Sequence, residues 1–274
     1  DVNSQADDHR TALQTASAYG DQKLVQLLLS KGAVDIQGGP YGSALIAACH
    51  FGFKEIIQLL LEHGADPNIQ GDQYGTALQA AASRDDMDIE VLQMLLEHGA
   101  DVNAQGGKFG TALQAAAHRD NMDMEVVQML LDHGADVNAQ GGKFGTALQA
   151  ASHRGHTEVV KALLERGADV DAQGGIYGTA LQAASVRGHM EVVELLLEKD
   201  ADVNAQGGEY GTALQAACNE GNMEIVQLLL ERGADVNAQG GPYGTALQAA
   251  CYEGNIEIVQ LLLERGADVN AQGG

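Results

Sequence analysis

The chain has 274 residues, of which 45% are hydrophobic and only 4% aromatic, and its formal net charge is −23. So negative a charge argues against nucleic acid as a partner, because proteins bind phosphate backbones through Lys and Arg. The sequence shows neither a signal-peptide pattern nor an apolar run of about 18 residues, so nothing in it points to a membrane. Its three cysteines, Cys49, Cys218 and Cys251, fit small buried thiols in a reducing cytoplasm, where we expect the protein.

One block of sequence recurs along the chain. In its most regular form, Thr212–Gly244, it reads TALQAACNEGNMEIVQLLLERGADVNAQGGPYG. Similar blocks, numbered here as repeats 1 to 8, begin at Thr11, Ser43, Thr76, Thr111, Thr146, Thr179, Thr212 and Thr245. Self-similarity at this period is typical of stacked-repeat architectures. We expect a single repeat domain over residues 1–274, in which residues 1–10 are the finger of a preceding repeat.

Each block predicts two short helices and a connector. Thr212-Ala-Leu-Gln215 fits a capping box, which begins a first helix of small residues, and Gly221 ends that helix. An apolar stripe predicts a second helix over about Met223–Arg232. The turn formers of Asp235–Gly241 predict an extended connector, which we call the finger. Because so small a pair of helices cannot bury its apolar face alone, the repeats must stack on one another.

In chain order, five repeats depart from this pattern. The finger of repeat 1 is one residue short, and repeat 2 has Ile46 in place of the capping Gln. Repeats 3 and 4 each carry two extra residues between the helices, around Asp85 and Asp120, and lack the Gly that ends the first helix elsewhere. In repeat 6, Asp200 replaces the Gly that ends the second helix, where a left-handed conformation would cost about 1 kcal/mol.

The period, the paired helices and the motifs TxLxxAA and LLLxxGADVN resemble the ankyrin repeat over the whole chain. The opening departs from the T-P-L-H of that family, since Ala77 and Gln79 stand where Pro and His are usual. The string GGxYGTALQAA is similar to ankyrin arrays of filamentous fungi, often the sensor regions of NACHT-type, NLR-like proteins. The resemblance implies an all-α repeat solenoid of eight helix-turn-helix units with extended β-hairpin-like fingers, whose concave face binds another protein.

Positions that are alike in every repeat build the stack, so information about a partner must lie where the repeats differ. One such position precedes the finger aromatic: Pro40, Gln73, Lys108, Lys143, Ile176, Glu209 and Pro242. Another, at the end of the first helix, holds Arg84, Arg119, Arg154 and Arg187, followed by Glu220 and Glu253. An Arg there gains about 0.3–1 kcal/mol from the helix dipole, or it belongs to a basic patch that binds carboxylates. The sequence leaves both interpretations open.

We expect the partner-binding surface to centre on repeats 3 to 6. Its candidate residues are Arg84, Arg119, Arg154, Arg187, Lys108, Lys143, His118, His153, Phe109, Phe144 and Tyr177. The recurring finger aromatics either pack finger against finger or contact a ligand at the rim. His63, His98 and His133 are expected at the ends of second helices, and the finger Asn residues are expected to stabilise turns.

No catalytic motif is present: the sequence lacks G-x-S-x-G, a phosphate-binding G-x-x-x-x-G-K-[ST] and a metal-spaced ligand set. We therefore predict no enzyme, no cofactor and no metal, but a module that binds a partner protein or acidic peptide. As alternatives, the chain is a structural spacer rod or an engineered consensus scaffold, although its deletions and insertions speak against design. It begins and ends within a finger without a polar capping repeat, which predicts a segment of a longer array and end-to-end self-association.

Overall fold

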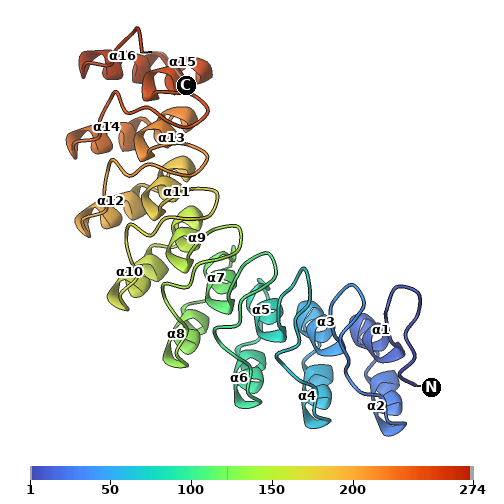
Figure 1. Ribbon diagram of the computed structural model, residues 1–274. Coiled ribbons are helices and arrows are strands. Elements are labelled where there is room, and N and C mark those ends of the chain that lie inside the picture. Colours follow the sequence, from blue (N-terminus) through green and yellow to red (C-terminus); the bar gives the residue numbers. More distant parts are fainter. Residues whose placement is uncertain (1, 122, 272–274) are drawn as a thin grey trace. The chain divides into compact units, whose positions relative to one another are not determined.

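The computed structural model describes residues 2–121 and 123–271, so Asp1, Met122 and the final three residues lie outside the described part (Figure 1). The described residues form sixteen α-helices and no β-strand, which agrees with the expected all-α repeat solenoid. The chain divides into two compact units, Asp1–Gly142 and Lys143–Gly274, and each is described by itself. The single domain over residues 1–274 stays a prediction.

The helices alternate between first and second members of a pair. The first unit contains α1 (Ala12–Tyr19), α2 (Gln22–Ser30), α3 (Ala44–Phe51), α4 (Lys54–Glu62), α5 (Ala77–Ala82), α6 (Ile89–Glu97), α7 (Ala112–Ala117) and α8 (Met124–Asp132). The second contains α9 (Ala147–Arg154), α10 (Thr157–Glu165), α11 (Ala180–Arg187), α12 (Met190–Glu198), α13 (Ala213–Glu220), α14 (Met223–Glu231), α15 (Ala246–Glu253) and α16 (Ile256–Glu264). Within a unit, each odd-numbered helix packs on the following even-numbered helix and on the next odd-numbered one.

The first helices begin as predicted, at a reciprocal capping box. Gln114 N donates to Thr111 Oγ1 at 3.3 Å, and Thr111 N donates to Gln114 Oε1 at 2.6 Å. The same pair of bonds begins the helices that follow Thr11, Thr146, Thr179, Thr212 and Thr245. At Ser43 only the hydroxyl accepts, because Ile46 cannot return a bond. The loss of half a capping box in repeat 2 is therefore confirmed.

The capping Gln also ties each helix to the finger that ends its repeat. Gln149 Nε2 donates to Ala172 O at 3.0 Å and to Gly178 O at 2.5 Å, and its side chain is buried. Gln182 makes the same two bonds to Ala205 O and Gly211 O. Buried polar groups need such partners, because each missing hydrogen bond costs about 1–3 kcal/mol. Gln thus joins the first helix to the finger, a function that the sequence did not reveal.

The fingers stack through backbone bonds and depend on glycine. Ile176 N donates to Lys143 O at 3.1 Å, and Glu209 N donates to Ile176 O at 2.8 Å. Gly175 has a φ of +59°, and a Cβ placed there would lie 2.3 Å from the carbonyl carbon of Phe144. Only glycine tolerates both the left-handed conformation and so close an approach. The Gly-Gly pair therefore allows one finger to lie directly on the next.

The finger Asn residues bridge repeats rather than stabilise turns alone. Asn103 Nδ2 donates to Gly134 O at 3.0 Å, and Asp136 N donates to Asn103 Oδ1 at 2.7 Å. Asn68, Asn204 and Asn237 make the same two bonds to the next repeat. At Asp171 the carboxylate accepts from Asp202 N at 2.8 Å, but it has no proton to donate.

Three further predictions concern single positions. Asp200 adopts a φ of +61°, which confirms the left-handed conformation expected there. His63, His98 and His133 cap α4, α6 and α8, and the Nδ1 of each lies 2.8 Å from the carbonyl oxygen four residues earlier. Cys49 and Cys218 are buried as expected, and burial raises the pKa of the Cys218 thiol to about 12. Cys251, at the C-terminal part of α15, is exposed, so the expectation of a buried thiol is wrong for this residue.

Candidate partner-binding surface

The two positions that vary between repeats each adjoin one ring contact between a finger and the end of a first helix. The aromatic of a finger packs on a residue at the C-terminal end of a first helix. Phe109 packs on His118, the C-cap of α7, with ring centroids 5.7 Å apart, and Phe144 packs on His153, the penultimate residue of α9, at 5.6 Å. Tyr243 and Tyr252 pack in the same way at 5.2 Å. We define the finger face of each repeat by four residues: the residue before the finger aromatic, that aromatic, and the two residues at the C-terminal end of the first helix that correspond to His153 and Arg154 of repeat 5.

In the first unit, the finger face begins with a cluster of aromatic rings. Tyr41 stacks on Tyr74 with ring centroids 5.9 Å apart, and His50 lies 4.2 Å from Tyr74 and 4.7 Å from Phe51. Phe51 is 36% exposed and Tyr19 is 80% exposed. Neither was expected as a site residue, although both stand where later repeats have Arg, so an alignment of the repeats identifies them.

Beside this cluster lies a hollow of about 570 Å³, which is lined by His50, Tyr74, Ser83, Arg84, Asp85, Asp86, Lys108, Phe109 and Asn121. Lys108 is exposed, and its ammonium nitrogen lies 4.5 Å from the centre of the Phe109 ring. Such a cation–π contact contributes about 0.5–1 kcal/mol at an exposed site and leaves the ammonium group accessible to water. Lys108 thus presents a positive charge to the hollow.

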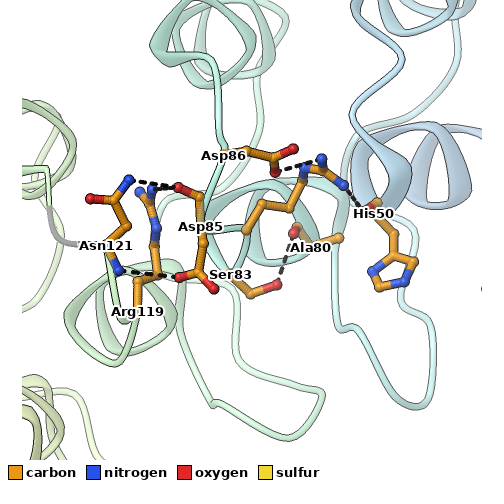
Figure 2. A network of polar contacts seen from close by, with 8 residues as sticks. His50, Ala80, Ser83, Asp85, Asp86, Arg119 and Asn121 are labelled. Atoms are coloured by element: carbon orange, nitrogen blue, oxygen red, sulfur yellow. Dashed lines mark hydrogen bonds and ion pairs between the residues drawn. The ribbon is translucent and has the colours of Figure 1, made fainter.

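The two candidate arginines of the first unit, Arg84 and Arg119, bind neighbouring repeats. Arg84 donates to the backbone oxygen of His50 and forms an ion pair of 2.6 Å with Asp86, and its side chain is 19% exposed. Arg119 is only 5% exposed, and its Nη2 donates to Asp85 O at 3.0 Å, as Figure 2 shows. These contacts favour a structural function for Arg84 and Arg119. They also place the Arg119 side chain beneath the surface that a partner could reach.

The extra residues of repeats 3 and 4 bind each other (Figure 2). Asp85 Oδ1 accepts from Asp120 N at 3.0 Å and from Asn121 N at 3.4 Å, while Asn121 Nδ2 donates to Asp85 O at 3.3 Å. Helices α5 and α7 end early, because no Gly supplies the left-handed residue that ends the other first helices. The insertions therefore form a polar bridge between two repeats at the edge of the hollow.

In the second unit, His153 is held within the finger face. Its exposed fraction is 7%, and its Nε2 shares a hydrogen bond of 2.9 Å with the hydroxyl group of Tyr177. Burial, helped by the positive charges of Arg187 and Arg154, lowers the pKa of His153 to about 4. His189 Nε2 donates to His153 O at 3.0 Å and fixes the same turn. His153 is thus neutral near pH 7 and adds no positive charge to this surface.

Three of the four finger aromatics of the second unit form a stack. Phe144 and Tyr177 have centroids 6.3 Å apart and planes 20° apart, and Tyr177 and Tyr210 follow at 6.5 Å and 13°. Phe144 is buried, whereas Tyr177 is partly exposed. The finger-to-finger packing of these aromatics is therefore present, and contact with a ligand at their exposed edges stays a prediction.

The charged residues of the second unit border this stack. Lys143 and Arg187 are exposed and Arg154 is half-buried, and Lys143 Nζ lies 5.7 Å from the Phe144 ring centre. The candidate arginines are therefore divided, with Arg84 and Arg119 in the first unit and Arg154 and Arg187 in the second. His118, the remaining candidate, is partly exposed beside Phe109.

A model of the family described as ankyrin repeats (3 copies) matches residues 1–71, 36–106, 70–141, 113–207 and 181–273. No curated protein matches the chain. Within residues 2–121 and 123–271, no group of three or more His, Cys, Asp or Glu side chains could hold a metal ion. None of the helices in the described part of the chain is both long and apolar enough to cross a membrane.

Proposed function

Since the chain belongs to the ankyrin repeat family, we propose that it is a protein-recognition module whose finger face binds a partner protein. One observation carries the proposal: a finger aromatic packs on the end of a first helix, and the two positions that vary between repeats adjoin this contact in the chain, one on each side. The recurring Thr, Gln, Asn and Gly residues are occupied by bonds within the stack. The exposed side chains of the finger face are therefore the ones that can determine which partner an array binds.

The charges of this surface favour an acidic segment as the partner of repeats 3 to 6. Lys108 and Lys143 are exposed and rest against aromatic rings, and Arg187 is exposed as well. A carboxylate that replaces water at such ammonium or guanidinium groups gains a charge-assisted hydrogen bond. Because Arg84 and Arg119 bind other repeats, the proposed contacts are Lys108 in the first unit and Lys143, Arg154 and Arg187 in the second.

We extend the proposal to the organisation of the protein. The chain contains eight repeat units with hairpin-like fingers, performs no catalysis and is the cytoplasmic sensor or scaffold part of a larger protein, similar to fungal NLR-like arrays. The nearly uniform sequence of the repeats favours one second function, that of a spacer rod. Exposed apolar side chains at the two ends, Leu24, Leu27, Tyr252, Ile256 and Leu263, support end-to-end self-association. Sedimentation of the chain would show this association as a mass that rises with concentration, whereas a strict monomer would contradict it.

Peptide selection tests the recognition function. A random peptide library displayed on phage is selected against the immobilised chain, and we expect enrichment of Asp and Glu. The affinity of a selected peptide should fall about tenfold in Lys108→Glu or Lys143→Glu. The matched control is Lys161→Glu on α10, an exposed charge away from the fingers, which should leave the affinity unchanged. Equal affinities for all these variants, or no enrichment at all, would contradict the proposal and favour the spacer.

A further inference from the structure

The finger face of the second unit changes its charge once along the stack of helices. Beside α9 stand Lys143 and Arg154, and beside α11 stand Ile176 and Arg187. Beside α13 stand Glu209 and Glu220, and beside α15 stand Pro242 and Glu253. Two positive layers are therefore followed by two negative layers, at the same two positions of the repeat.

These layers are in register, so the change of sign occurs along one surface. Helices α9, α11, α13 and α15 pack in that order, and the rings of Phe144, Tyr177 and Tyr210 stack in parallel. The fingers of the first three layers are joined by the bonds from Ile176 N to Lys143 O and from Glu209 N to Ile176 O. In these three layers the backbone and the rings thus form a regular floor, beside which the charged side chains change sign.

Those side chains are open to solvent and close to the floor. Lys143, Arg187, Glu209, Glu220 and Glu253 are all exposed. Burial raises the pKa of Tyr177. The negative charge of Glu209 raises this pKa further, whereas the positive charge of Arg187 lowers it. Burial also raises the pKa of Tyr210, assisted by Glu220 and Glu209. The border between the two signs therefore lies between the layers of Tyr177 and Tyr210, and charges of both signs act on each of these two side chains.

We propose that the finger face of the second unit binds an extended segment with acidic residues at one end and basic residues at the other. The charge order of the surface fixes which end of the segment lies on which layers. This inference rests on the proposed recognition function and refines the partner expected from the sequence. A uniformly acidic segment that extends over all four layers would be repelled by Glu220 and Glu253. A segment bound in the reverse direction would place its basic end against Arg154 and Arg187, which would repel it as well.

The length of such a segment follows from the spacing of the layers. Helices pack about 8–10 Å apart, so four layers extend over about 30 Å. An extended chain covers at most about 3.3–3.6 Å per residue, so a segment of about ten residues reaches from the first layer to the last. Contacts between opposite charges act mainly on specificity and orientation, because like charges that face each other are disfavoured. The aromatic floor supplies apolar contact area common to both halves.

Photo-crosslinking tests the orientation. The probes are two ten-residue peptides with a Glu-rich half and a Lys-rich half, one with a benzophenone group at its acidic end and one at its basic end. Each is crosslinked to the whole chain, and the products are mapped by mass spectrometry. We expect crosslinks from the acidic end within residues 143–187 and from the basic end within residues 209–253. Crosslinks of both ends distributed equally over both regions would overturn the inference.

A charge exchange provides the matched variant. Replacing Lys143 and Arg187 by Glu, and Glu209 and Glu220 by Lys, preserves the net charge and should exchange the two crosslinked regions. The control exchange, Lys161→Glu with Glu194→Lys on α10 and α12, should leave the map unchanged. Circular dichroism checks that both variants fold. If the fourfold variant does not, Arg187→Glu alone is used, and the ratio of correct to reversed crosslinks should fall about tenfold; an unchanged ratio would overturn the inference.

Peptide affinities separate a failure of this inference from a failure of the recognition function. The mixed peptide should bind at least about tenfold more tightly than an all-Glu or an all-Lys peptide of the same length. If all three bind equally and Lys143→Glu weakens all of them, recognition stands and the charge-order inference is wrong. If no substitution on the finger face affects any peptide, the recognition function itself is contradicted.

Discussion

Arg119 Nη2 donates a hydrogen bond of 3.0 Å to the backbone oxygen of Asp85 in the preceding repeat, and the Arg119 side chain is only 5% exposed (Figure 2). The contact exists because repeats 3 and 4 carry matching insertions, whose residues Asp85, Asp120 and Asn121 also bind each other. An arginine that appears from the sequence to belong to a surface column is thus part of the joint between two repeats.

Arg119→Met is therefore expected to destabilise the fold. The substitution keeps much of the apolar stem but removes the hydrogen bond from the guanidinium group to Asp85 O, and a hydrogen bond to a charged group contributes about 1.5–3 kcal/mol. Urea unfolding of the whole chain measures the loss. The matched substitution Arg187→Met, at an exposed residue of the same column, should change the free energy of unfolding by less than about 0.5 kcal/mol. Equal stabilities for the two variants would show that the buried bond contributes nothing.

Gly167 and Gly175 both have a positive φ, and a comparison of the two distinguishes the cost of backbone strain from the cost of a steric clash. Gly167 has a φ of +86° with nothing within 4 Å of an added Cβ, whereas at Gly175 a Cβ would lie 2.3 Å from the carbonyl carbon of Phe144. Gly167→Ala should cost about 1–2 kcal/mol from the left-handed conformation alone. Gly175→Ala should cost clearly more, because two fingers must also move apart. Thermal unfolding compares them, and an equal loss would mean that the fingers do not need this close approach.

Asp200 offers a stabilising substitution. Its φ of +61° places a non-glycine residue in the left-handed region at the end of a second helix, where most repeats have Gly. Asp200→Gly should stabilise the chain by about 1 kcal/mol, because glycine adopts this conformation without steric strain. Differential scanning calorimetry should detect a higher melting temperature. A lower one would show that the Asp side chain contributes more than its backbone strain costs.

His153 makes the stability of the second unit dependent on pH. Burial lowers its pKa to about 4 from an ordinary value of 6.5, so the folded state favours the neutral ring. Its contribution is fully present above pH 6.5 and is lost as the pH falls from 6.5 towards 4, because the unfolded state binds the proton first. We expect His153→Gln to flatten the pH dependence of the melting temperature in this window. Parallel curves for the variant and the wild-type chain would contradict the assignment.

The sequence predicts the repeat elements well because their signals are local. The capping box, the left-handed glycines and the apolar stripe act within one repeat, so even the exceptions at Ile46 and Asp200 have the predicted consequence. The second helix of repeat 7, predicted to end near Arg232, ends at Glu231, with Arg232 as its cap.

What the sequence does not predict are contacts between repeats. The double bond of Asn103 to the next repeat, the bond of Gln149 to its finger and the burial of Arg119 depend on how neighbouring layers are placed. Neither the hydrophobic period nor the helix propensity of a single repeat determines that placement. The candidate surface was located by comparing repeats, which identifies exposed variable positions. The same comparison cannot distinguish Arg119, which an insertion buries, from Arg187, which stays exposed.

The central claim is that the finger face is the recognition surface. It is tested most directly by comparing the hydrogen–deuterium exchange of the whole chain with and without a saturating concentration of a peptide selected from the library. The account predicts slower exchange in the fingers around Lys108, Lys143, Ile176 and Glu209 and at the ends of the first helices. The even-numbered helices should exchange at an unchanged rate. Protection confined to those second helices, with the fingers unaffected, would contradict the account.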